Sequence, residues 1–141
     1  VLACRSLAKR SMGGLIIITR KNNLDIHAQT GEIIDAAINS RLIENLFFKN
    51  SPLHDGALII SNERIIAASC ILPVSKNQQI PKRLGLRHRS ALGITEQTDA
   101  IAIIVSEETG KISYAINGEL TLNVKPEELE MFLSEALYAY K

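Results

Sequence analysis

Short apolar runs, separated by polar segments, repeat along most of the chain. The runs rich in β-branched residues predict strands at residues 15–19, 33–38, 57–60, 65–72, 100–105, 112–116 and 120–124. Apolar residues at helical spacing predict a first helix over residues 1–12, short helices after Ser40 and over 87–94, and a final helix from Pro126. Strands outnumber helices in the middle of the chain, so we expect an α/β domain with a mixed central β-sheet flanked by helices.

Local signals mark where some of these elements begin and end. Gly13-Gly14 would end the first helix, because glycine commonly terminates helices. Ser40 can cap the short helix that follows it, since a serine hydroxyl accepts a hydrogen bond from a free N–H of the first turn. Asn117-Gly118 predicts a tight turn between two strands.

Composition limits the class of protein. The 141 residues, 46% hydrophobic and 22% charged, suit a globular domain, and we expect residues 1–141 to form a single one. Aromatic residues make up only 4%, with no tryptophan, so the core must be built from smaller aliphatic side chains. Few aromatics and a net charge of +1 at pH 7 also argue against a nucleic-acid partner.

The cysteines and the hydropathy of the chain indicate the cellular compartment in which the protein would be found. Cys4 and Cys70 form neither a disulfide framework nor a zinc-binding spacing, which favours a reducing compartment. No stretch approaches the roughly 18 apolar residues of a membrane span, and no signal peptide is visible. The chain opens with Val1 inside a predicted helix, so we expect a fragment, and any upstream membrane anchor would lie outside it.

Charge is unevenly distributed. Six basic residues and no acidic residue lie between Arg64 and Gly93, whereas nine acidic and three basic residues follow from Glu96 onward. A basic region next to an acidic one suits a multiply charged anion that arrives with a metal ion. Chance clustering on a solvated surface is the alternative.

Three polar clusters are candidates for chemistry. The first, His54-Asp55-Gly56, precedes a predicted strand. The aspartate and the imidazole are suitable ligands for Mg²⁺ or Mn²⁺, and a glycine lets a backbone approach a ligand closely. Asp-Gly is also a common turn dipeptide, so a plain turn is the alternative.

The second cluster is Arg87-His88-Arg89, at the predicted start of a helix. Arginine binds phosphate oxygens in pairs, and the free N–H groups of a helix start also favour phosphate. Arg87 and Arg89 could converge on one anion there, unless the cluster is only a solvated basic surface.

The third cluster runs from Ser106 through Glu107 and Glu108 to Gly110, at the end of the strongest predicted strand. Its adjacent glutamates could ligate a metal ion or decorate a turn, and ligands commonly sit at strand ends in α/β sheets. The chain has no phosphate-binding loop of the Gly-Lys-Ser/Thr type, no serine nucleophile elbow and no cysteine–histidine signature.

Taken together, these clusters resemble the diadenylate cyclase family, whose hallmark motifs are Asp-Gly-Ala and Arg-His-Arg. Here the motifs are Asp55-Gly56-Ala57 and the second cluster, and the segment 105–110, Val-Ser-Glu-Glu-Thr-Gly, also matches. The likeness extends over nearly the whole chain and is strongest to the membrane-tethered branch, which implies a cytoplasmic domain of a membrane-anchored protein. Leu86 departs from the threonine that often precedes Arg-His-Arg, so one hydroxyl contact to phosphate would be missing.

The resemblance implies an enzyme that condenses two ATP molecules into cyclic di-AMP and releases two pyrophosphates. The nucleotides would bind on two facing subunits of a head-to-head homodimer, and each 3′-hydroxyl would attack the α-phosphorus of the other ATP. With its Mg²⁺ or Mn²⁺ cofactor, Asp55 would lower the pKa of the attacking hydroxyl.

The resemblance also assigns roles to single residues. Asp55 would be the catalytic residue. Substrate would contact Gly56, Ala57, Leu72, Arg87, His88, Arg89 and Ser106, with Leu72 beside the adenine and the Arg-His-Arg motif on the triphosphate. The metal would be held by His54, Asp55 and Glu108, with Glu107 as a substitute.

Three other functions remain open from the sequence. A degenerate domain could bind ATP or cyclic di-AMP without chemistry, although both hallmark motifs are intact. A metal-dependent phosphohydrolase could use His54, Asp55 and the glutamates, although such sites usually gather more ligands. A structural partner domain with a basic surface would bind no nucleotide.

Overall fold

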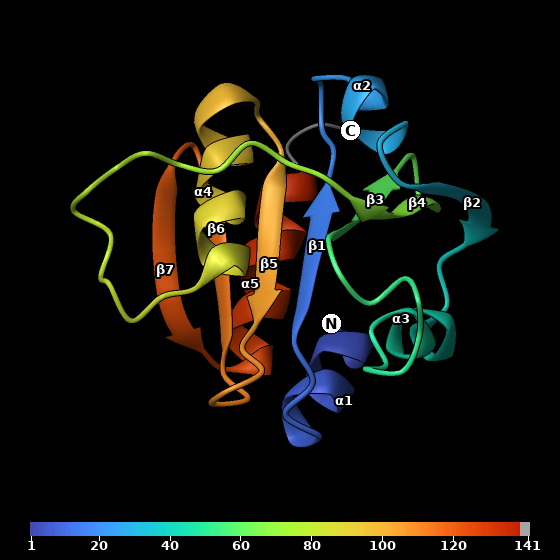
Figure 1. The fold of residues 1–141 in the computed structure, drawn as a ribbon, viewed down its shortest axis with the longest axis horizontal. Helices are drawn as coiled ribbons and strands as arrows, with labels where there is room; N and C mark the ends of the chain where they lie inside the picture. The colour runs from blue at the N-terminus through green and yellow to red at the C-terminus, as the bar shows by residue number, and fades with distance from the viewer. Residues whose placement is uncertain (139–141) are drawn as a thin grey trace.

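The computed structural model describes residues 1–138, which form one seven-stranded sheet covered by helices (Figure 1). The strand order is β2-β4-β3-β1-β5-β6-β7. Only β1 and β3 pair in parallel, and every other neighbouring pair is antiparallel, so the predicted mixed sheet is confirmed. The strands are β1 (Gly14–Ile18), β2 (Glu32–Ala37), β3 (Ala57–Ser61), β4 (Arg64–Cys70), β5 (Ile101–Val105), β6 (Ile112–Ile116) and β7 (Glu119–Val124).

Helices cover both faces of the sheet, and the central strands are therefore buried on both sides. The helices are α1 (Leu2–Lys9), α2 (Asp25–Ala28), α3 (Ser40–Leu46), α4 (Leu86–Gln97) and α5 (Pro126–Tyr138). Apolar residues of α1, α3 and α5 pack against one face, and those of α2 and α4 pack against the other. Successive side chains of β1 point to opposite faces of the sheet. Ile16 therefore packs on the face covered by α1, α3 and α5, and Ile17 on the face covered by α2 and α4.

Three local predictions differ from the structure. Ser40 is the first residue of α3 and not its cap; Asn39 caps the helix, its Oδ1 accepting a hydrogen bond of 3.1 Å from the Leu42 N–H. The first helix ends at Lys9, and Gly14 already belongs to β1. Helix α2 was not predicted, because four residues are too few to show a helical period.

The predicted turn is confirmed, and both cysteines are buried. Asn117 and Gly118 both have positive φ, at 52° and 76°, and join β6 to β7 as a tight hairpin turn. Cys4 and Cys70 are buried free thiols. Burial raises the pKa of Cys70 to about 11, so this thiol is protonated and unreactive at neutral pH.

Candidate functional site

A cavity of about 770 Å³ opens at the edge of the sheet where β3 begins and β5 ends. These two strand ends lie together because β1, between them, is parallel to β3 and antiparallel to β5. The N-terminus of α4 completes the wall at the same edge, the lower one in Figure 1. The chain therefore brings its three polar clusters to one cavity from segments far apart in sequence.

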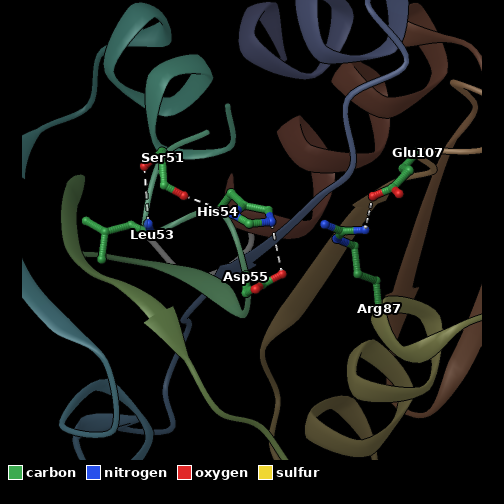
Figure 2. Close-up of polar contacts among 6 residues, drawn as sticks. All are labelled: Ser51, Leu53, His54, Asp55, Arg87 and Glu107. Carbon is green, nitrogen blue, oxygen red and sulfur yellow. Dashed lines mark hydrogen bonds and ion pairs between the residues drawn. The ribbon is translucent and has the colours of Figure 1, made fainter. Parts of the chain in front are cut away.

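The loop before β3 supplies His54 and Asp55. His54 Nδ1 lies 2.9 Å from the carbonyl oxygen of Ser51, and its Nε2 lies 3.2 Å from Asp55 Oδ1 (Figure 2). Because a carbonyl oxygen only accepts, Nδ1 carries the hydrogen, and Nε2 is directed toward the carboxylate. A ring nitrogen anchored in this way is typical of metal-binding histidines. The Asp55 side chain is 84% exposed at the cavity rim.

Gly56 is constrained by the neighbouring strand. Its φ is +83°, and a Cβ there would lie 2.7 Å from the carbonyl carbon of Ser69 and 2.8 Å from the carbonyl oxygen of Cys70. The glycine thus lets the loop turn tightly against β4 while it also lines the cavity. Ala57, the next residue, is buried in the core and does not line the cavity.

The Arg-His-Arg motif forms the first turn of α4. Arg87 and His88 line the cavity, but Arg89 does not, because residues two apart on a helix point in different directions. The first turn contains no acidic residue, and the cap, Gly85, offers no side-chain acceptor. The positive end of α4 is therefore left to face the cavity, as an anion site requires.

His88 is a neutral side chain in a positive setting. Burial lowers the pKa of His88 below its ordinary value of about 6.5, and the nearby charges of Arg87 and Arg83 lower it further. A neutral imidazole can donate one N–H to a phosphate oxygen without adding a further positive charge to the cavity wall.

This shift predicts a pH dependence of stability. The unfolded chain binds a proton at His88 below about pH 6.5, whereas the folded chain resists it, so acidification favours unfolding. We expect the free energy of unfolding to fall as pH drops from about 6.5 toward the lower folded-state pKa, with no contribution from His88 above about pH 7. Urea titrations at stepped pH should give a flatter profile for His88→Gln. Equal slopes in both proteins would contradict the prediction.

The third cluster forms a turn and also lines the cavity. The Gly110 N–H donates to the Ser106 carbonyl at 2.8 Å, and the Ser106 N–H donates to the Lys111 carbonyl at 2.9 Å. This turn places Ser106, Glu107 and Glu108 on the cavity wall. The turn predicted for this cluster is confirmed, and metal ligation by its glutamates stays a prediction.

An ion pair links the second and third clusters. Arg87 Nη1 lies 3.3 Å from Glu107 Oε2 (Figure 2). The Arg87 side chain is 26% exposed and the Glu107 side chain 59%, so water reaches the pair from the glutamate side. The ion pair with Glu107 thereby favours one orientation of the guanidinium. Glu108, the other glutamate of this turn, does not pair with Arg87.

The four predicted metal ligands do not form a closed cage. Within residues 1–138, no three His, Cys, Asp or Glu side chains gather closely enough to hold a metal ion by themselves. Mg²⁺ is nonetheless commonly held by one or two carboxylates together with substrate phosphates and water. The carboxylates of Asp55 and Glu108 on the cavity wall fit that donor chemistry, whereas the imidazole of His54 is a nitrogen donor, which Mg²⁺ accepts less readily.

Sequence reasoning missed several residues of the cavity, and Leu72 lies away from it. Leu72 is buried in the core beside Ile80. Arg83 and Lys111 add positive charge to the wall, and Lys111 could have been found from its place directly after the glutamate turn. Asn123 lines the wall because the pairing of β6 with β7 is irregular there and the Asn123 backbone has a positive φ of 56°. The sequence does not reveal such a bulge, so this residue could not be predicted.

Known proteins share both the sequence and the fold. A family model described as DisA bacterial checkpoint controller nucleotide-binding matches residues 1–120. The diadenylate cyclase of Listeria monocytogenes is 47% identical over 131 residues, covering 93% of this chain and 48% of that protein. The cyclic di-AMP synthase CdaA of Bacillus subtilis is 46% identical over the same shares. The chain thus spans about half the length of these curated relatives.

A solved structure extends the likeness to the backbone. The crystal structure of a double mutant of DacA from Staphylococcus aureus matches with a TM-score of 0.95 at 42% sequence identity. The match covers 97% of this chain and 91% of the other. Within the part of the chain that the structure describes, no helix is long and apolar enough to span a bilayer.

Proposed function

The chain belongs to the diadenylate cyclase family, and we propose that it condenses two ATP molecules into cyclic di-AMP and two pyrophosphates. One observation carries the proposal: a single cavity is lined by Asp55 and Gly56, by Arg87 and His88, and by the turn that starts at Ser106. These groups have the chemistry to bind a nucleoside triphosphate and to orient an attacking hydroxyl. The activity belongs to residues 1–141 as one catalytic domain.

Phosphate binding rests on the cavity's positive wall. Arg87 would pair with phosphate oxygens through its planar fork, and His88 would donate one N–H. The free N–H groups of the first α4 turn would add neutral donors, and Ser106 a hydroxyl. Arg89 lies outside the cavity wall and would act only through the field of its charge. Catalysis of this kind consists mainly of positioning and charge neutralisation.

Asp55 would act on the nucleophile. Its exposed carboxylate would accept a hydrogen bond from a ribose 3′-hydroxyl and take its proton as the oxygen attacks the α-phosphorus in line. The new O3′–P bond forms as the bond between the α-phosphorus and the pyrophosphate oxygen breaks. Two such transfers close the ring.

A divalent cation completes the charge balance of the proposed site. Mg²⁺ or Mn²⁺ would be held by Asp55, His54 and Glu108 together with the substrate, with Glu107 as an alternative ligand. When bound, the ion would neutralise charge on the phosphates and the departing pyrophosphate.

Two subunits would share the reaction. A cavity of about 770 Å³ has room for one nucleotide, and the reaction joins two. We therefore propose that two chains meet head to head, so that the nucleotide in each cavity attacks the other. Cyclic di-AMP would form between them and leave when the facing cavities separate.

The proposed substrate, ATP, indicates where in the cell the domain would act. ATP is a cytoplasmic metabolite, so we propose a cytoplasmic domain. The greater length of the relatives allows an anchor outside this chain to attach it to a membrane.

A product assay tests the proposal against its rivals. Purified chain would be incubated with ATP and Mn²⁺ or Mg²⁺, and the products identified by mass. Cyclic di-AMP with pyrophosphate would support the cyclase. Inorganic phosphate without a cyclic product would indicate a phosphohydrolase, bound ATP without product would indicate a nucleotide-binding module, and no binding would indicate a structural domain.

A further inference from the structure

Gly13 lies directly before β1, against the ion pair of Arg87 and Glu107. A Cβ built on Gly13 would collide with Arg87 Nη1, would lie 2.6 Å from Arg87 Cζ, and would lie 2.9 Å from Glu107 Cβ. Real Cβ atoms essentially never approach other heavy atoms so closely. The guanidinium therefore occupies the space that a side chain at residue 13 would need.

Space, and not backbone conformation, calls for glycine at this position. Gly13 is not among the glycines with positive φ, so an alanine could adopt its backbone conformation. The obstacles differ from those at Gly31, where a Cβ would strike the backbone oxygen of Ala68. At Gly13 the obstacle in closest contact is the far end of the Arg87 side chain, which can swing away, whereas Glu107 Cβ, at 2.9 Å, calls for a small shift of the turn that carries it.

The adjacent glycine makes a matched comparison. A Cβ on Gly14 would meet only apolar side-chain atoms, 3.3 Å from Leu7 and 3.4 Å from Phe47. Gly14 does not line the cavity, and no charged side chain is among its nearest neighbours. The two neighbouring glycines therefore separate an effect on Arg87 from a general effect of adding a methyl group here.

We propose that Gly13 is a positioning residue for phosphate recognition, which holds the Arg87 fork at the angle that the nucleotide's phosphate oxygens require. This inference rests on the proposed function. The guanidinium is fixed on two sides, by Glu107 at 3.3 Å and by the bare Cα of Gly13. Bidentate phosphate binding depends on the orientation of the planar fork, so an unanchored arginine loses affinity although its charge remains.

The expected effect of Gly13→Ala follows from the overlap. Moving Arg87 Cζ from 2.6 Å to an ordinary contact of about 3.5 Å displaces the guanidinium by about 1 Å. A displacement of that size in a positioning group reduces kcat/KM by about 10- to 100-fold. The affinity for ATP should fall by about tenfold, because the charge is retained but the paired geometry is lost.

A double-mutant cycle tests whether Gly13 acts through Arg87. ATP affinity would be measured by calorimetry for the wild type, G13A, R87A, the double variant and the control G14A. We expect G13A to bind about tenfold more weakly, G14A to bind as the wild type does, and G13A to cause no further loss once Arg87 is removed. Additive losses, or wild-type affinity in G13A, would overturn the proposal.

Two further readouts keep the test independent of folding and of the proposed activity. If G13A fails to fold, the double variant should regain the fold, because the colliding guanidinium is gone and only the 2.9 Å approach to Glu107 Cβ remains, which a small shift of the turn relieves. Failure of both variants would overturn the proposal. A crystal structure of G13A should show Arg87 displaced from Glu107, whether or not the chain binds ATP. An Arg87 left in place would refute the inference alone, whereas a wild type that binds no ATP would refute the proposed function.

Discussion

Replacing Asp55 by asparagine is expected to reduce the formation of cyclic di-AMP below detection, a loss of about 10³-fold or more. Asparagine has nearly the same shape as aspartate, but it carries no charge and cannot take a proton from the attacking hydroxyl. The side chain is 84% exposed, and within residues 1–138 its one ion pair is with His54 at 3.2 Å, so the fold does not depend on its charge. Turnover is measured by mass analysis of the product, and folding by thermal denaturation.

Asp35 offers a matched control for this substitution. It is also an exposed aspartate in an ion pair, with Arg64 Nε at 2.9 Å, but it lies on the edge strand β2 away from the cavity. Asp35→Asn should retain full turnover, since exposed ion pairs contribute little stability and asparagine tolerates the positive φ of 50° there. Wild-type turnover in Asp55→Asn would remove Asp55 from the mechanism.

Replacing Gly93 by alanine is expected to cause a large loss of stability. Gly93 lies in the middle of α4, where the segment after β4 crosses the helix. A Cβ would strike the carbonyl oxygen of Pro73 and lie 2.6 Å from its carbonyl carbon and 3.0 Å from the Ser75 nitrogen. These are backbone atoms, tied to the helix by the Ser75 N–H bond of 2.9 Å to the Arg89 carbonyl.

Two effects oppose each other in Gly93→Ala, and their sizes decide the sign. Alanine favours a helix over glycine by about 1 kcal/mol. Overpacking against fixed backbone costs about 3 kcal/mol or more. We therefore expect a net loss of about 2 kcal/mol or more, which is about 4 to 8 °C in melting temperature for a chain of this size.

Gly85→Ala is the control for this prediction. A Cβ on Gly85 would meet nothing within 4 Å, so only the poorer capping of α4 by alanine counts, about 0.5 to 1 kcal/mol, and the melting temperature should fall by about 1 to 3 °C. Thermal denaturation of both variants beside the wild type measures the difference. Equal melting temperatures for Gly93→Ala and Gly85→Ala would show that the segment at Pro73 yields freely, which contradicts the packing described here.

The sequence predicted the strands and the main helices because their signals are local. A β-branched run such as that of β5 needs no partner to be identified, and Pro126 with its acidic neighbours marks the start of α5. Helix α2 is too short for a period, and the choice between Asn39 and Ser40 as a cap depends on one side-chain orientation. Strand order is not local, so the position of β1 between β3 and β5 could not be read from the chain.

The candidate site divides in the same way. The sequence identified the three polar clusters that contain Asp55, Arg87 and Glu107. These residues line one cavity only because of the strand order of the sheet, which the sequence does not reveal. A tripeptide motif also cannot tell which of its members face the cavity. Arg89 points away from the cavity because of the rotation of the helix between residues 87 and 89. Gly13 lies next to Arg87 although the two residues are 74 positions apart in the sequence, so no local pattern could reveal its role.

Product formation as a function of protein concentration tests the central claim most directly. The purified chain would be titrated over a wide concentration range with saturating ATP and Mn²⁺, and cyclic di-AMP quantified by mass. If two chains must meet to join two nucleotides, the rate will rise more steeply than linearly at low concentration and become linear once the dimer is formed. A rate strictly proportional to protein concentration throughout, with sedimentation showing a monomer, would contradict the account.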